Sequence, residues 1–553
     1  MKHKKNKNYS FNFAATIAKK PERSKTDHSH KHITTQNAGD LMPILCKEII
    51  PGDLINIKIK ALIRQTTLIK PTMDTAYIDI AVFFVRNQTI WDDWKKFMGE
   101  NEDPWAPKER PTIPQVTAPD IGWQTGTVAD ILKIKLNTPK ISVSKLQFNA
   151  VAKIVNDWYR DENLQNSYLI DTTSSDIEGS NGNTYNDLAR GGKIPKSNKY
   201  HDYFTSALPS PQKGEAIKIG ITTDQDLEVH AIKNKRVTNT ENDDTLRFDN
   251  MGLAQNAAAI IEKTDENFSN ALRAGQSGTG GTAGSGILSP NNLFAHIKQE
   301  QAITINELRS AIAAQQILEA DARGGTRYVE KLKAQWGVTS PDATQQRAEY
   351  LGGTHTALSI QQVEQTASTN ETTPQANLAA YGQSGIESPK ITKAFTEHGF
   401  LIVMATIRYE HSYQQGIPKQ YLRKTELDFY NPILANVGEQ PIKNAEIYAT
   451  GTIADEENFG YKEAWGEYKT EQNAVTGLMR SEAKQSLDAW HYADNYKEQP
   501  ILGEEWIKED EKNIDRTLAI KSDEQPQFLS DYWFDLIMER PIPLFNIPGL
   551  NRI

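Results

Sequence analysis

The sequence predicts a mainly β protein, an all-β sandwich or barrel with long insertions. Ile55, Ile57 and Ile59 alternate with polar residues, which predicts a strand with one buried and one solvated face. Residues 77–85 and 401–409 continue this β pattern with longer apolar runs. The 25 Pro and 34 Gly are spread widely along the chain, which favours many turns and loops.

Residues 75–107 are the stretch around which the rest of the chain is organised. Asp79 is the only polar residue in the apolar run 77–85, so both faces of this strand are expected to be covered by protein. A short helix is expected over residues 89–98. Thr89 and Asp92 have the spacing of an N-cap and its N3 residue, and Gly99 can close the helix.

Longer helical patterns occur in two other places. Residues 144–159 begin with a capping-box pair, Ser144 and Gln147, and continue with apolar residues at helical spacing. Residues 302–336 form the clearest helical region, which Gly324 and Gly325 interrupt. Its expected inner stripe consists of Leu308, Ala311, Ile312, Gln315, Leu318 and Ala322. A weaker helical stretch is expected over residues 251–261.

The charge of the chain is distributed unevenly. The 553 residues carry a formal net charge of -9, whereas residues 1–32 hold nine Lys or Arg against two acids. This segment therefore carries +7 and the other 521 residues carry -16. We interpret residues 1–32 as a basic flexible N-terminal arm on an acidic body.

Cysteine content and hydropathy narrow the class of protein. Cys46 is the only cysteine, so the chain cannot form an internal disulfide and suits a reducing compartment during folding. No apolar run approaches the roughly 20 residues that span a bilayer. We therefore expect no membrane span.

The sequence contains no complete motif for catalysis, cofactor binding or metal binding. The Gly-rich run 275–286 has Gly275 and Gly280 at Walker A spacing, but residue 281 is Gly where Lys is needed. Residues 27–32 contain three histidines, which are more often solvated than metal-bound in so basic a segment. The sequence contains pairs of adjacent acids such as Asp92 with Asp93, Glu456 with Glu457, and Glu504 with Glu505. Such pairs are typical of solvated polar surfaces. We therefore predict that the protein is not an enzyme and has no cofactor, no catalytic residues and no metal site.

Several long segments resemble one known family. FFVRNQTIWDDWKKFMGE (83–100), HDYFTSALPSPQKG (201–214) and the run from ELRSAIAAQQ to RAEYLGG (307–353) are similar to the major capsid proteins of the Microviridae. These are small icosahedral single-stranded DNA phages, and the similarity is to their gokushoviruses. Further matching segments extend the resemblance from about residue 36 to residue 549.

The resemblance implies a fold and a function. The fold would be the eight-stranded antiparallel viral jelly roll with long inserted loops and a few helices, forming one domain over residues 33–553. The function would be that of a major capsid protein, with sixty copies closing a T=1 icosahedral shell around circular single-stranded DNA. The protein would reside in the virion and assemble in the cytoplasm of a bacterial host. Its other partners would be internal scaffolding and DNA pilot proteins and a host cell-surface receptor.

Two groups of residues are expected to contact partners. The nucleic-acid-binding candidates in the arm are Lys2, Lys4, Lys5, Lys7, Lys19, Lys20 and Arg23. Residues 215–292 match the position of the family's variable surface insertion, which forms spikes at the three-fold axes. The host-attachment candidates within it are Gly275, Gly278, Gly280, Gly281, Gly284 and Gly286.

Two other functions are compatible with a β sandwich. A cellular β-sandwich module that binds carbohydrate through exposed tryptophans would be a monomer with a soluble ligand. A polysaccharide-cleaving enzyme would depend on one of the acid pairs. Neither explains why the family resemblance covers nearly the whole chain.

Overall fold

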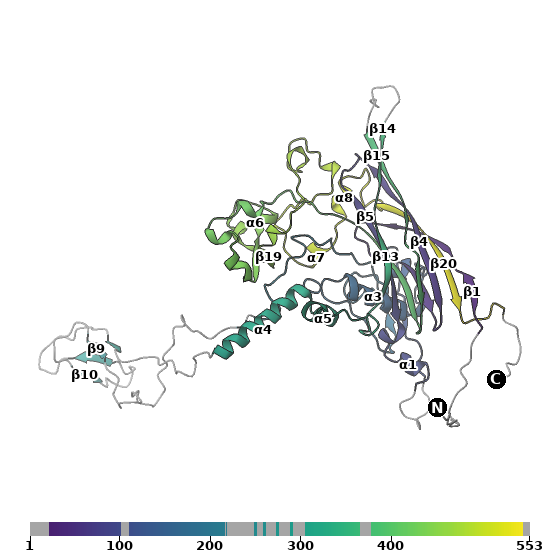
Figure 1. Cartoon of the computed structure of the whole chain (residues 1–553), viewed down its shortest axis with the longest axis horizontal. Helices are drawn as coiled ribbons and strands as arrows, with labels where there is room; N and C mark the ends of the chain where they lie inside the picture. Colours follow the sequence, from purple (N-terminus) through teal and green to yellow (C-terminus); the bar gives the residue numbers. More distant parts are fainter. Residues whose placement is uncertain are drawn as a thin grey trace, which may run out of the picture. The chain divides into compact units, whose positions relative to one another are not determined.

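The computed structural model describes residues 22–100, 110–215, 305–364 and 378–545, together with short strands between residues 248 and 290. The chain divides into two compact units. One comprises Met1–Glu215 and Ile317–Ile553, and the other comprises Ala216–Gln316. The larger unit is mainly β, with several antiparallel sheets and few helices (Figure 1).

The largest sheet contains strands from both ends of the chain. It runs in the order β1-β20-β4-β15-β14. In addition, β2 pairs with β20 and β16 pairs with β4. Its strands are β1 Ser24–Asp27, β2 His30–Gln36, β4 Leu54–Leu68, β14 Ile360–Glu364, β15 Leu378–Glu387, β16 Ile391–Ala394 and β20 Phe528–Arg540. All of these pairs are antiparallel. The C-terminal strand β20 thus lies between the N-terminal strands and β4.

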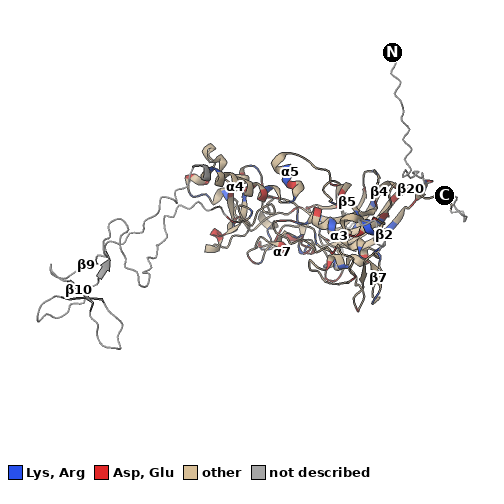
Figure 2. Ribbon diagram, turned by 90° about the horizontal axis from the view of Figure 1, so that it is seen from below, with Lys and Arg blue, Asp and Glu red and all other residues tan. Residues whose placement is uncertain are grey.

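One face of this sheet carries charged side chains in cross-strand pairs. Lys31 contacts Asp531 at 2.7 Å, and Lys60 contacts Asp535 at 2.7 Å. Figure 2 shows basic and acidic positions interspersed around β2, β4 and β20. The solvated face expected from the polar positions of residues 54–60 is confirmed.

A second sheet has four antiparallel strands in the order β13-β5-β17-β3. They are β3 Met42–Ile49, β5 Ala76–Arg86, β13 Glu349–Ala357 and β17 Gly399–Tyr409. The predicted strands 77–85 and 401–409 are β5 and β17, which pair with each other along their full lengths.

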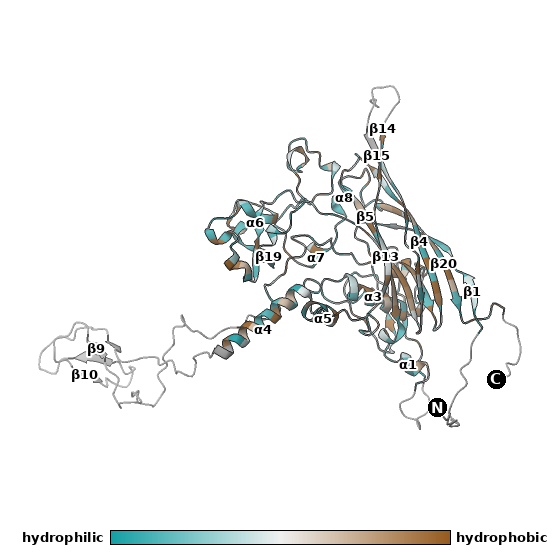
Figure 3. Ribbon diagram, in the orientation of Figure 1, coloured by the Kyte–Doolittle hydropathy of each residue, from teal (hydrophilic) through white to brown (hydrophobic). Residues whose placement is uncertain are grey.

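The main hydrophobic core joins the two sheets. Alternate residues of β4, including Ile57, share one buried cluster with alternate residues of β5, β17 and β20, such as Ile80, Val403 and Phe534. Figure 3 shows hydrophobic residues concentrated along these strands. The residues between these on β5 and β17 face the other side of the sheet. Among them, Phe83 and Ile402 belong to a second buried cluster. The prediction that both faces of residues 77–85 are covered is therefore confirmed.

Helices and loops cover that second face. The cluster contains buried residues of α2 Val128–Ile131 and α3 Leu146–Ile154, together with Trp91 and Trp123. Helix α3 continues as a π-helical turn, Val155–Tyr159. The expected helix over residues 144–159 is confirmed, although Ser144 ends the short strand β7 Ser142–Ser144 and the N-cap is Lys145.

The helix expected over residues 89–98 is shorter than predicted. A 3₁₀ turn covers Asn87–Thr89, and helix α1 covers only Trp94–Phe97. The expected N-cap Thr89 donates its hydroxyl to the Arg86 carbonyl at 2.7 Å, so it belongs to the preceding turn. Gly99, with φ of 101°, ends the segment as expected.

The helical region of residues 302–336 is confirmed as α4 Ile305–Gly324 and α5 Tyr328–Trp336. Gly325 has φ of 88°, which only glycine adopts readily, and it separates the two helices as predicted. In the expected inner stripe Ala322 is buried, whereas Leu308 and Ile312 are exposed. The stripe is therefore buried only near the C-terminal end of α4.

In the unit Ala216–Gln316, strand β9 Phe248–Asn250 pairs with β12 Leu288–Pro290. Strand β10 Ala258–Ile261 pairs with β11 Leu272–Gly275. The helix predicted over residues 251–261 is wrong for residues 258–261, because these pair as a strand. Residues 251–257 lie outside the described residues.

Loops with short elements complete the larger unit. The short strands are β6 Gln115–Thr117, β8 Ile177–Glu178, β18 Glu439–Lys443 and β19 Asn458–Glu463. The short helices are α6 Asn444–Ile447, α7 Glu504–Ile507 and α8 Lys512–Asp515. A third buried cluster, which includes Phe204, Tyr413 and Phe459, supports the loops around β18 and β19.

Candidate functional site

Most of the predicted nucleic-acid contacts lie outside the described residues. Lys2, Lys4, Lys5, Lys7, Lys19 and Lys20 all precede residue 22. Arg23 is described, and its guanidinium contacts Glu539 at 2.8 Å and the Gly52 carbonyl at 2.7 Å. Residues 24–27 and 30–36, at the C-terminal end of the predicted arm, pair with β20 as strands.

The candidate attachment residues are also mostly outside the described part of the chain. Gly275 is the last residue of β11. Gly278, Gly280, Gly281, Gly284 and Gly286 fall between the described strands β11 and β12, outside the described residues.

Acid pairs and histidines singled out from the sequence hold the chain together locally. Asp92 accepts a hydrogen bond from the Thr172 hydroxyl at 2.7 Å, which joins two loops. His32 contacts the Ile44 carbonyl at 2.7 Å, and His30 stacks on the Phe534 ring. Among the residues that the structure describes, no group of three or more His, Cys, Asp or Glu side chains is arranged to hold a metal ion.

Cys46 lies on β3 with its thiol among apolar neighbours of the second cluster. Burial raises the pKa of this thiol to about 12. The thiolate is the reactive form of cysteine, so Cys46 is protonated and unreactive near neutral pH.

Asp79, the lone polar residue of β5, joins four segments. Its carboxylate contacts Arg408 Nε at 3.0 Å, the Tyr200 hydroxyl at 2.8 Å and His355 Nδ1 at 2.6 Å. The Arg408 guanidinium also lies 4.0 Å from the centre of the Tyr200 ring. Although burial disfavours the charged form, Arg408 holds the pKa of Asp79 below its ordinary value. The contacts attach the loop carrying Tyr200 to the four-stranded sheet, at its two inner strands β5 and β17.

A second charge cluster is completely buried. His411 lies between two carboxylates, with Nδ1 2.9 Å from Asp494 Oδ1 and Nε2 3.1 Å from Glu509 Oε1. Because both ring nitrogens face carboxylate oxygens, both must donate, which requires the imidazolium form. Lys199 lies 3.7 Å from Asp494 and over the Trp506 ring.

The electrostatics of this cluster agree with its geometry. Desolvation opposes the charge on His411, but Asp494 and Glu509 outweigh it and raise the pKa of His411 to about 9. Burial likewise opposes the charge on Asp494, yet His411 and Lys199 hold its pKa well below the ordinary value. The side chains of His411, Asp494 and Glu509 are at most 3% exposed. No substrate can reach them, so the cluster ties distant segments together.

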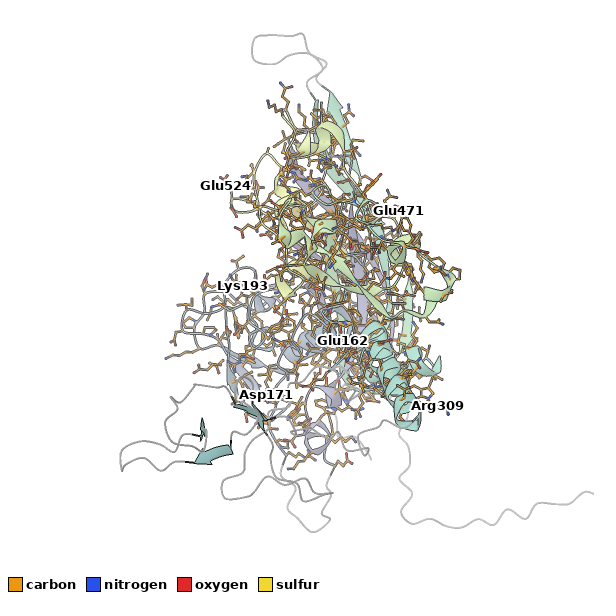
Figure 4. The ribbon with its side chains drawn as sticks, turned by 90° about the vertical axis from the view of Figure 1, so that its left-hand side faces the viewer. Glu162, Asp171, Lys193, Arg309, Glu471 and Glu524 are labelled. Carbon is orange, nitrogen blue, oxygen red and sulfur yellow. The ribbon has the colours of Figure 1, made fainter. Side chains whose placement is uncertain are left out.

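A third contact lies at the turn between α4 and α5 (Figure 4). Glu162 accepts from the Thr326 amide at 2.9 Å and from its hydroxyl at 2.8 Å. Against the effect of burial, hydrogen bonds from Glu330 and Thr326 lower the pKa of Glu162 to about 2. The turn is thereby fixed to the loop that follows α3.

In the described part of the chain these features form a frame in which paired charges connect distant segments, and comparison with known proteins identifies its family. The sequence model of the capsid protein (F protein) family matches residues 15–550. The chain belongs to this family of phage capsid proteins. The match and the relatives below confirm the resemblance to Microviridae capsid proteins of the gokushovirus type.

Three relatives align with this chain over nearly its whole length. Capsid protein VP1 of Spiroplasma virus 4 is 43% identical over 537 residues, which is 96% of each chain. Capsid protein VP1 of Chlamydia phage 1 is 34% identical over 578 residues, again 96% of each. Capsid protein VP1 of Bdellovibrio phage phiMH2K is 35% identical over 532 residues, 95% of each.

Membership in this family means a structural role in a virus particle, with copies of the chain assembling into a shell. In the described part of the chain, none of the helices combines the length and apolar character needed to cross a bilayer.

The charge clusters around Asp79 and His411 were not foreseen from the sequence. Asp79 was noticeable as the one polar residue of its strand, whereas nothing local marks His411.

We expect the buried imidazolium to make the stability of this capsid protein depend on pH. The folded-state pKa of His411, about 9, exceeds the ordinary value of about 6.5, so its contribution is complete below pH 6.5 and is lost as pH rises through 9. The loss is on the order of 3 kcal/mol, because each pKa unit corresponds to about 1.4 kcal/mol. The measurement is the urea midpoint of the full chain from pH 6 to 10.

The variant His411→Gln should lower the free energy of unfolding at pH 7 by about 3–5 kcal/mol, because it leaves two buried carboxylates without their cation. It should also remove most of the decline in stability between pH 6.5 and 9. His201→Gln, at an exposed position, is the matched control and should retain that decline. Equal pH profiles for the wild type and His411→Gln would contradict the assignment.

Proposed function

We propose that this protein is the major capsid protein of a small phage, assembling into a T=1 icosahedral shell around a circular single-stranded DNA genome. The observation that carries the proposal is the similarity to phage capsid proteins over about 95% of the chain. In this proposal the protein acts within the virion and assembles in the cytoplasm of its bacterial host. Internal scaffolding and DNA pilot proteins and a host receptor are its further partners.

The strand order supports the finer proposal that the sandwich is an eight-stranded jelly roll. Taking β1 with β2 and β15 with β16 as single strands, and setting aside β14, which forms a hairpin with β15, one sheet runs β2-β20-β4-β15 and the other runs β3-β17-β5-β13. Among these eight, consecutive strands alternate between the sheets, except that β5 and β13 are neighbours in one sheet. This alternation supports a fold of two Greek keys wound into a jelly roll.

The work of such a subunit is self-association. Subunits of a closed shell meet head-to-tail around rotation axes, so every contact closes a ring and none extends a fibre. A sandwich that is well packed and fixed by buried ion pairs suits this task, because small deviations at each contact would prevent closure. Long loops between the strands supply contact area.

Electron microscopy with a mass measurement on particles from producing cells tests the proposal. The expected result is closed shells of uniform diameter with about sixty subunits. Since one chain has a mass of 62.1 kDa, the protein shell should weigh about 3.7 MDa. A chain that stays monomeric even when co-expressed with the neighbouring phage genes would overturn the proposal.

We further propose that the arm lies inside the shell and neutralises DNA phosphates through Lys2, Lys4, Lys5, Lys7, Lys19 and Lys20, with Arg23 at its base. Deleting residues 1–21, which stops before β1, should leave shells that assemble but contain less DNA. The measurement is the ratio of nucleic acid to protein absorbance in purified particles.

Replacing the six arm lysines with arginine is the matched control for this deletion and should restore normal DNA content, because it retains the charge. Replacing them with glutamine should reproduce the deletion. Unchanged DNA content in both the deletion and the glutamine variant would remove the proposed role.

The insertion 215–292, with Gly275, Gly278, Gly280, Gly281, Gly284 and Gly286, is proposed as a three-fold spike used in host attachment. Replacing residues 276–286 with a short Gly-Ser linker should spare assembly and reduce adsorption to host cells. Particle yield and the rate of adsorption are measured together. Failed assembly would instead assign the loop to a subunit contact.

A further inference from the structure

Exposed apolar side chains gather on the loops between residues 417 and 468, here named the 417–468 surface. They are Ile417, Tyr421, Leu427, Phe429, Tyr430, Ile433, Val437, Ile453 and Tyr468. Ile433 and Ile453 are 87% and 89% exposed. Single exposed apolar residues are normal on soluble proteins, whereas a group of them marks a site of interaction.

The surface contains a hollow. A cavity of about 580 Å³ lies among these loops, and its lining combines charged side chains with the apolar residues Ile417, Leu422, Leu427, Pro441 and Trp465. Protruding side chains therefore surround a depression large enough for an apolar anchor. Interfaces between proteins concentrate their binding energy in such pockets.

The loops that carry the surface are ordered within the single chain. Asn431 Oδ1 accepts from the Ile433 amide at 3.0 Å, and Trp465 Nε1 donates to the Leu434 carbonyl at 3.0 Å. The Tyr430 ring packs on the Trp465 ring, with the two ring centres 5.6 Å apart. Because the backbone is already fixed, burial of the apolar side chains by a partner would require little further ordering.

The charges within the surface are neutralised by contacts inside the chain. Arg423 contacts Glu467 at 3.3 Å, and its guanidinium carbon lies 4.5 Å from the centre of the Tyr468 ring. Lys424 contacts Glu456 at 2.6 Å. These cations are therefore not free to bind phosphates, as a nucleic-acid site would require. Exposed apolar side chains beside charges that are paired within the chain fit a protein partner.

We propose that the 417–468 surface is a subunit interface, covered in the assembled particle by a second copy of this chain. The inference rests on the proposed shell-forming function. The larger unit also exposes an apolar segment directly after β20, containing Ile542, Leu544 and Phe545. Figure 1 places the end of β20 on the opposite side of this unit from α6 and β19. One copy can therefore offer a segment to another copy's surface, as a head-to-tail contact requires.

Cysteine labelling tests this proposal in the full chain. Because Cys46 is protonated near neutral pH, a cysteine introduced by Ile433→Cys should be the main reactive thiol. Its maleimide labelling should be at least about tenfold slower in particles than in unassembled subunits, since an interface core excludes solvent. The wild-type chain, with Cys46 alone, gives the background. Equal labelling rates in particles and subunits would overturn the proposal.

Assembly of a double variant provides a second measurement. Leu427→Asp with Ile433→Asp should leave the unfolding midpoint unchanged, because both residues are exposed, but should reduce particle yield at least about tenfold. Leu427→Met with Ile433→Leu keeps the apolar area and is the matched control, expected to assemble normally. Normal yield of the Asp variant would contradict the interface.

These experiments distinguish a wrong interface assignment from a wrong proposed function. A particle reconstruction that places a second copy over Ile433 supports the inference, whereas DNA or a different protein at that position overturns it. If the wild-type chain forms no closed shells at all, the proposed function has failed. If shells form and Ile433→Cys reacts freely within them, only the interface assignment has failed.

Discussion

The four-stranded sheet β13-β5-β17-β3 must be covered on both faces, and the rest of the larger unit satisfies that constraint. Residues of β5 and β17 are apolar on both sides, and exposing either side would cost roughly 25 cal/mol for each Å² of apolar surface. The larger sheet covers one face and the layer of α2, α3, Trp91 and Trp123 covers the other. Segments from both ends of the chain are needed for this arrangement, because β2 and β20 complete the covering sheet.

Buried charges then fix loops onto this frame. Asp79 attaches the loop of Tyr200 to the sheet, and His411 connects segments about one hundred residues apart in the sequence. Such groups are costly to bury unless each one is paired, so the arrangement that pairs them is strongly favoured over alternatives. A subunit that must present the same edges to several neighbours benefits from this rigidity.

The protein acts through its surfaces. Family membership establishes a capsid role, and the described part of the chain contains buried clusters in which the charges are paired. The loops between residues 417 and 468 combine order with a dense group of exposed apolar side chains. In a shell protein such features belong together, because a contact that forms many times must be fixed in shape before subunits meet.

The sequence by itself determined the β class, the strands around Ile57, Ile80 and Val403, and the helices α3, α4 and α5, because these depend on local periodicity. It also determined the family, through long matching segments. Strand β20 was missed although Phe534 and its neighbours alternate clearly with polar residues. Its place between β2 and β4 joins residues about five hundred positions apart, which local pattern cannot specify. Only the tertiary structure decided the partners of Asp79 and His411 and the start of α1, because those contacts arise when distant segments close around the shared core.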